Sequence, residues 1–220
     1  MKPTIAVFVH QPYCSIQSDN GIIKALSPKY NFKIFTKHKL EDNFFDDVDC
    51  IAIPGGLGDA DKFEMCFASN GVRIKKFIAD GGKYLGICMG AYWAGQHYFN
   101  VLEDVDAVQY IKQPNTCTRR PHAKNMSITW NNHPEKMFFY DGCALVGDKD
   151  KFETIATYSN GDAMAVIQRN IGLIGCHPES EIHWYNSYSW MKGLYHEGRH
   201  HKLLLEFVNK LMRNTNTINI

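Results

Sequence analysis

Short apolar runs alternate with helical patterns along the first half of the chain. Apolar residues gather in four segments of strand length, residues 4–10, 31–36, 48–56 and 83–87. Between them, residues 18–26 offer Ser18 or Asp19 as the N-cap of a helix. Residues 71–82 place apolar side chains at helical spacing and end in a glycine stop. This alternation predicts a parallel sheet that helices cover on both faces.

From about Asn100 onward the pattern changes to short β runs separated by turn signals. These runs are residues 127–130, 143–147, 153–158, 163–168 and 171–176. They predict antiparallel strands or hairpins that are added to the sheet. Residues 199–213 place their apolar side chains on one helical face, so we expect a closing helix that docks on the core.

Composition narrows the class of protein. The chain has 220 residues, of which 45% are hydrophobic and 21% charged, and its net charge is +1. These values predict a single globular domain over residues 1–220. A charge near zero favours neither a nucleic-acid nor a membrane partner, and no apolar run approaches the roughly 20 residues of a membrane span. Seven cysteines without paired spacing favour a reducing cytoplasm over a disulfide framework.

A glycine-flanked cysteine stands between the fourth predicted strand and the helix that follows it. Gly86 and Gly90 bracket Cys88 with the spacing of a nucleophile elbow, a strained turn that needs small neighbours. A thiol in this turn lies at the start of a helix, where the partial positive charge favours the thiolate. The backbone N–H of Met89 would face a developing oxyanion. The spacing alone also fits a buried sulfur.

Two further segments end at the same predicted edge of the sheet. His177 follows the last apolar strand, and Glu179 is placed to accept the other imidazole proton. After the third strand, Gly55 and Gly56 let backbone N–H groups approach a reacting carbonyl. Taken singly, these features also fit a structural histidine and an ordinary turn. Because open α/β sheets bind ligands at the carboxyl ends of their strands, together they predict one shared site.

These motifs resemble the class I glutamine amidotransferase-like superfamily. Within it, they are most similar to the amidotransferase-like domain at the N-terminus of biotin–protein ligases, which also occurs as a stand-alone protein. The resemblance covers about residues 4–184, the expected core, and includes a Thr-Cys loop at residues 115–121. It implies a flavodoxin-like, three-layer α/β fold with a mainly parallel sheet and antiparallel additions in the second half.

Matched by position, the resemblance implies a role for each residue of the site. Cys88 would be the nucleophile, His177 the base and Glu179 the orienting acid. Gly56 and Met89 would offer the N–H groups that hold an oxyanion. No cofactor is implied.

Five other residues are candidates for the wall of the pocket. They are Tyr92 after the elbow, Cys117, Arg119 and Arg120 in the Thr-Cys loop, and Cys14 in the first strand-to-helix loop. Either arginine would suit a substrate carboxylate, and a solvated basic turn is an equal alternative. Cys14 would be a second thiol at the same sheet edge or an ordinary loop cysteine. The aromatic segment 183–191 would form a helix-packing face, or a wall over the thiol.

Two departures from the family pattern bear on the reaction. Glutamine-hydrolysing members carry Gln after the second glycine of the elbow, whereas this chain has Ala91 and Tyr92. The amidotransferase-like part accounts for the 220 residues of the sequence, and this length disfavours an attached synthetase or biotin-ligase domain. We therefore expect a cysteine-dependent hydrolase or amidotransferase acting on a small amide or ester. The rival hypotheses are a binding or regulatory module that works through a partner protein, and a redox- or electrophile-sensing thiol.

A zinc-protease pattern occurs near the C-terminus. Residues 196–200 match His-Glu-x-x-His, in which a continuous helix would present His196 and His200 to zinc, with Glu197 as base. Gly198 interrupts this helix at a cost of about 1 kcal/mol relative to alanine, and it better marks the boundary before the closing helix. We therefore predict no metal site here.

Overall fold

The computed structural model describes residues 2–214, and within them eleven strands form one sheet. The strands are β1 (Thr4–Phe8), β2 (Asn31–Phe35), β3 (Cys50–Ile53), β4 (Lys83–Ile87), β5 (Val105–Gln109), β6 (Lys124–Trp130), β7 (His133–Phe139), β8 (Cys143–Gly147), β9 (Glu153–Tyr158), β10 (Ala163–Gln168) and β11 (Ile171–Ile174). The α-helices are α1 (Ile16–Leu26), α2 (Phe63–Phe67), α3 (Gly71–Ala79), α4 (Met89–Trp93), α5 (Ile182–Asn186) and α6 (Arg199–Arg213). Short 3-10 helices are η1 (Ala60–Lys62), η2 (Tyr110–Lys112) and η3 (Lys149–Lys151).

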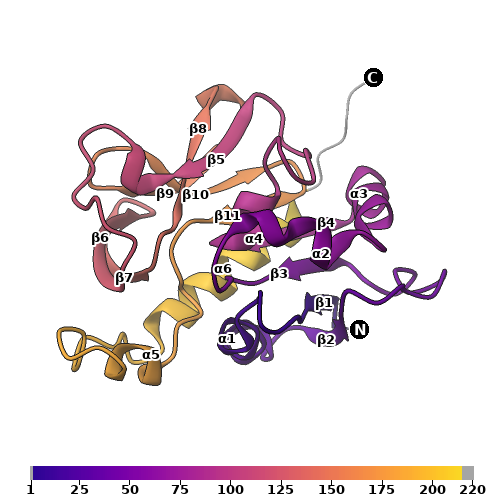
Figure 1. Ribbon diagram of the computed structural model, residues 1–220, viewed down its shortest axis with the longest axis horizontal. Coiled ribbons are helices and arrows are strands. Elements are labelled where there is room, and N and C mark those ends of the chain that lie inside the picture. The colour runs from indigo at the N-terminus through magenta and orange to yellow at the C-terminus, as the bar shows by residue number, and fades with distance from the viewer. Residues whose placement is uncertain (1, 215–220) are drawn as a thin grey trace.

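The sheet has a parallel half and an antiparallel half. The parallel half runs in the order β2-β1-β3-β4-β11. Beyond β11, strands β10, β9, β6 and β7 pair in antiparallel fashion, and β8 joins β5 to β10. In Figure 1 the antiparallel strands lie at the upper left and the parallel strands toward the right. The predicted α/β class, with antiparallel additions in the second half, is confirmed.

Helices cover both faces of the parallel half. Because side chains alternate along a strand, Ile5 and Val7 of β1 join a core that α1 and α6 complete. Ala6 and Phe8 of the same strand join a second core with α2, α3 and α4. Because these strands run parallel, their carboxyl ends all lie at one edge of the sheet. The loops that lead into α1 and α4 begin at that edge.

Helix α6 closes the fold and has the predicted bounds, Arg199–Arg213. Leu204, Phe207, Val208 and Leu211 are buried on its inner face, as its amphipathic pattern requires. Across residues 2–214, none of the helices combines the length and the apolar content that crossing a membrane would demand.

Two strands and one helix boundary differ from the sequence-based expectation. Strand β7 begins with polar residues and Pro134, and it is found at the end of the sheet order, where a missing N–H is tolerated. Strand β5 has only three apolar residues, too few to stand out as a β run. The N-cap of α1 is Ser15 rather than Ser18 or Asp19, which lie buried within the first turn of the helix. That shift places two polar side chains inside the protein.

Candidate active site

Cys88 occupies a strained turn between β4 and α4. Its φ is +50° and its ψ is −104°, a conformation that a non-glycine residue rarely adopts. A Cβ atom at Gly86 would lie 2.5 Å from the carbonyl oxygen of Gly90, and one at Gly90 would lie 2.2 Å from that of Ile53. The flanking glycines are therefore required by close backbone contacts, which hold the thiol at the end of β4.

We expect Gly90→Ala to lower the free energy of unfolding by about 1–3 kcal/mol, because the added methyl group must displace backbone atoms. Denaturant unfolding followed by circular dichroism measures this change. Gly71→Ala is the matched control, since a Cβ atom there would meet only ordinary contact with Phe67 at 3.7 Å. Equal stability of the two variants would contradict the steric argument for the elbow.

His177 lies in the loop after β11 and is held by a carboxylate. Its Nδ1 is 2.9 Å from Oε1 of Glu179, and both side chains are buried. Phe138 and Trp184 pack edge-on against the imidazole ring. Burial by itself lowers the pKa of His177, but the charge of Glu179 and the interaction with Cys88 outweigh it and raise the pKa to about 10. The contacts of the imidazole with Glu179 and Cys88 therefore favour its protonated form.

Ser18, which the sequence pattern offers as a helix cap, also belongs to this cluster. The hydroxyl of Ser18 donates to Oε1 of Glu179 at 2.6 Å and accepts from the N–H of Gly55 at 3.0 Å. Helix α1 approaches closely, because a Cβ atom at Gly21 would lie 2.2 Å from the carbonyl oxygen of Glu179. The available sequence signal was two polar residues on the inward face of an amphipathic helix.

The backbone N–H groups near Cys88 differ in whether they donate a hydrogen bond within the protein. The N–H of Gly55 is bonded to Ser18. The N–H groups of Gly56 and Met89, by contrast, find no hydrogen-bond acceptor anywhere in residues 2–214. A Cβ atom at Gly56 would lie 2.1 Å from Sδ of Met89, so the two residues are in close contact. Two free donors thus flank the thiol.

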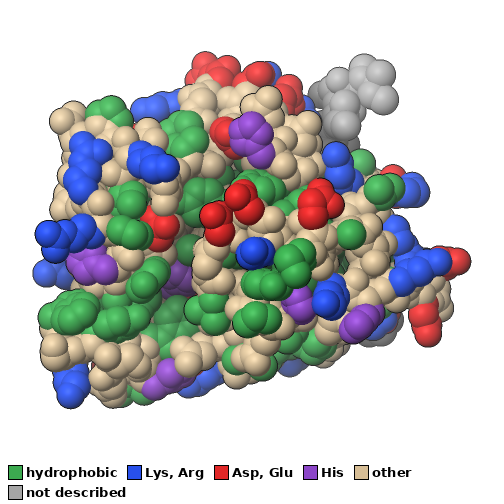
Figure 2. Space-filling model, in the orientation of Figure 1, with side chains coloured by type: hydrophobic (Ala, Val, Ile, Leu, Met, Phe, Trp, Pro, Cys, Tyr) green, Lys and Arg blue, Asp and Glu red, His purple; other side chains and the backbone are tan. Residues whose placement is uncertain are grey.

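A cavity of about 1250 Å³ connects these groups. Of the residues expected in the site, it is lined by Gly55, Gly56, Cys88, Met89, Tyr92 and His177. Aromatic side chains form another part of the wall, namely Phe138, Tyr140, Trp184 and Tyr188. Segment 183–191 thus contributes to the cavity lining, and Trp184, Tyr185 and Met191 of the same segment pack with Phe138 in a small core cluster. In Figure 2, hydrophobic side chains gather at the lower left, over α5 and the segment that follows it.

Four residues expected in the pocket are not among those that line this cavity. Cys14 is buried and pairs through its backbone with Gly56. Cys117 is exposed, with its sulfur 3.2 Å from Sδ of Met126. The guanidinium of Arg119 donates to backbone carbonyl oxygens of its own region, and Arg120 is exposed. None of the four side chains is among the lining residues.

The His-Glu-x-x-His segment does not form a continuous helix. Glu197 and Gly198 have φ values of +51° and +77°, so α6 begins only after them. Nε2 of His196 is 2.9 Å from the carbonyl oxygen of Ser180. Burial lowers the pKa of His196 to about 3 and that of His200 to about 4. Over residues 2–214, no three His, Cys, Asp or Glu side chains are grouped to hold a metal ion.

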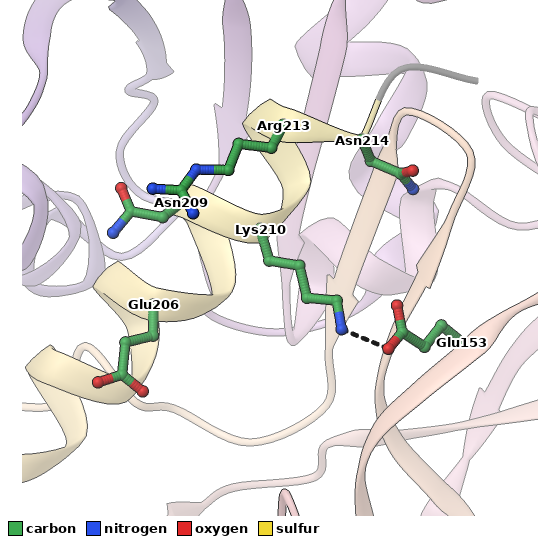
Figure 3. Close-up of a pocket in the computed structure, with 6 residues that line it drawn as sticks. All are labelled: Glu153, Glu206, Asn209, Lys210, Arg213 and Asn214. Carbon is green, nitrogen blue, oxygen red and sulfur yellow. Dashed lines mark hydrogen bonds and ion pairs between the residues drawn. The ribbon is translucent and has the colours of Figure 1, made fainter. Parts of the chain in front are cut away.

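A smaller hollow of about 520 Å³ lies along α6, and Lys210 forms an ion pair there with Glu153 of β9 (Figure 3). Its lining contains no thiol or imidazole and consists of Glu153, Glu206, Asn209, Lys210, Arg213 and Asn214. Compared with this hollow, the Cys88 cavity contains both a thiol and an imidazole in its lining.

This fold, with a cysteine elbow and a His-Glu pair at the carboxyl edge of a parallel sheet, is the class I glutamine amidotransferase-like fold of flavodoxin type. Residues 14–109 match the family of the biotin-protein ligase N-terminal region. The resemblance inferred from the sequence motifs is thereby confirmed. No curated protein sequence matches the chain.

Solved structures agree on the fold. PurLQS from Thermotoga maritima shares 19% identity at a TM-score of 0.63, over 96% of this chain and 100% of that chain. A glutamine amidotransferase from Thermotoga maritima shares 11% identity at a TM-score of 0.64, and the match covers 97% of this chain and 99% of that chain. A glutamine amidotransferase from Methylobacillus flagellatus shares 11% identity at a TM-score of 0.62, and the match covers 100% of this chain and 99% of that chain. At these identities the comparison establishes the fold.

Proposed function

We propose that this glutamine amidotransferase-type domain is a thiol hydrolase or amidotransferase that uses Cys88, His177 and Glu179 on a small amide or ester. The observation that carries the proposal is the buried His177–Glu179 pair, of which His177 lines the same cavity as the strained Cys88. A nucleophile, a base and a group that orients the base are the three parts that covalent acyl transfer requires.

In the proposed reaction, the Cys88 thiolate attacks the substrate carbonyl carbon and forms a C–S bond. The resulting oxyanion accepts hydrogen bonds from the N–H groups of Gly56 and Met89. The His177 imidazolium donates its proton to the leaving amine or alkoxide as the C–N or C–O bond breaks. Water or an acceptor amine then attacks the thioester, His177 takes its proton, and the thiolate is released. Glu179 keeps the imidazole oriented throughout.

The thiol reactivity of Cys88 tests this assignment without knowledge of the substrate. We expect Cys88 to react with iodoacetamide at pH 6.5 about ten-fold faster than Cys117, because a neighbouring imidazolium favours the thiolate. Cys117 is exposed and lies outside the cavity, so it serves as an internal reference. Peptide mass spectrometry measures both rates in one sample. Slower modification of Cys88 than of Cys117 would overturn the proposal.

A second candidate function is a binding module that works through a partner protein. One observation favours it: Trp190 is 59% exposed and packs against Tyr188, which lines the cavity. One similar fold, from Thermoplasma acidophilum, belongs to a protein assigned as a GMP synthase subunit. This alternative predicts ligand or partner binding that Cys88→Ala leaves unchanged, which a thermal-shift or pull-down measurement detects.

A further inference from the structure

The hydroxyl group of Ser18 contacts both Glu179 and the backbone of Gly55. Its side chain is completely buried in the first turn of α1, 161 residues away in sequence from the glutamate that it contacts. A hydroxyl group has one proton to donate. Because the carboxylate of Glu179 can only accept, that proton goes to Oε1, and the oxygen of Ser18 is left to accept from Gly55. The hydroxyl is therefore fixed in one orientation.

Ser18 is not needed to start the helix. The N-cap of α1 is Ser15, whose hydroxyl accepts from the backbone N–H of Ser18 at 3.4 Å. The side chain of Ser18 is thus free for its long-range contacts. This separates its role from helix capping, the usual reason for serine at a helix start.

Glu179 depends on few hydrogen-bond donors. Its Oε1 accepts from Ser18 and contacts Nδ1 of His177. Its Oε2 is buried and has no hydrogen-bond partner among residues 2–214, and neither oxygen of the neighbouring Asp19 carboxyl group is hydrogen-bonded within those residues. Loss of the Ser18 hydroxyl would leave His177 as the only side chain that solvates this carboxylate.

We propose that Ser18 is a positioning residue that couples the orienting acid of the triad to the oxyanion loop. Through Glu179 it fixes the imidazole of His177, and through Gly55 it fixes the loop that presents the N–H of Gly56. One hydroxyl thereby sets the distance between the base and the oxyanion donors. This inference rests on the proposed Cys-His-Glu reaction for its catalytic meaning, although the coupling itself can be measured without a substrate.

The test compares Ser18→Ala with Ser27→Ala, the same change at the exposed other end of α1. NMR titration of the His177 ring and iodoacetamide modification of Cys88 are the two readouts. For Ser18→Ala we expect the His177 midpoint to fall by about one pH unit, because Ser18 then no longer holds the Glu179 side chain in place against Nδ1 of the imidazolium. Modification of Cys88 at pH 6.5 should slow about ten-fold. Ser27→Ala should match the wild-type protein in both readouts.

A double variant separates positioning from general packing. If Ser18 acts through Glu179, adding Ser18→Ala to Glu179→Gln should slow Cys88 modification by less than about two-fold further. A full multiplicative loss in the double variant, or a His177 titration that Ser18→Ala leaves unchanged, would overturn the coupling. An unreactive Cys88 in the wild-type protein would instead refute the proposed function, and the His177 titration would still decide the role of Ser18.

Discussion

Replacing Cys88 with alanine abolishes the turnover of any amide or ester that the wild-type protein cleaves. The expected loss in kcat is about 10⁴-fold or more, because the reaction then has no atom to carry the acyl group. Steady-state rates with chromogenic amides and esters measure the loss. Intact-mass spectrometry should also show an acyl adduct on the wild-type protein and none on the Cys88→Ala variant.

Cys117→Ala is the matched control for this experiment. It removes an exposed thiol outside the cavity and should leave turnover unchanged. Turnover by Cys88→Ala at the wild-type rate would refute Cys88 as the nucleophile. Binding of the same compounds without turnover by either protein would favour the partner-dependent module.

The turn at Cys88 could be predicted because part of what determines it is local. Gly86 is needed by its contact with the backbone of Gly90, four residues on, and this contact leaves a fixed spacing in the sequence. Gly90 in turn is needed by its contact with Ile53 at the end of the neighbouring strand β3. His177 could be placed by chain order alone, since it follows a strand that lies parallel to and beside the strand before Cys88. Both signals require only the regularity of a parallel sheet.

Ser18 and Asp19 could not be predicted in the same way. Their roles depend on how closely α1 approaches the loop after β11, a contact between segments about 160 residues apart. In the sequence, both residues look like helix caps, which is their commonest use. For Arg119 the sequence suggests a ligand contact that the structure does not show. Its guanidinium group donates hydrogen bonds to nearby backbone carbonyl oxygens instead. Sequence shows a charge but not the direction of its side chain.

Asp19→Asn is expected to stabilise the protein near pH 8. The Asp19 side chain is 2% exposed, and neither of its carboxylate oxygens has a hydrogen-bond partner within residues 2–214. Burial, and then the charge of Glu179, raise the pKa of Asp19 from 3.8 to about 8. Between these two pH values the folded state holds a proton that the unfolded state has lost, so stability falls as the pH rises. The upper limit of this penalty is of the order of 5 kcal/mol at pH 8.

The gain from Asp19→Asn should therefore depend on pH. Well below pH 3.8, where the aspartate is neutral in both states, the variant and the wild-type protein should differ little. The difference should grow toward pH 8 to about 2 kcal/mol, since the new amide must also find partners. Urea unfolding at several pH values measures it, with the exposed Asp46→Asn as control. A gain that does not change with pH would show that Asp19 carries its charge in the folded protein at no cost, and the buried carboxylate would then have a partner outside the contacts described.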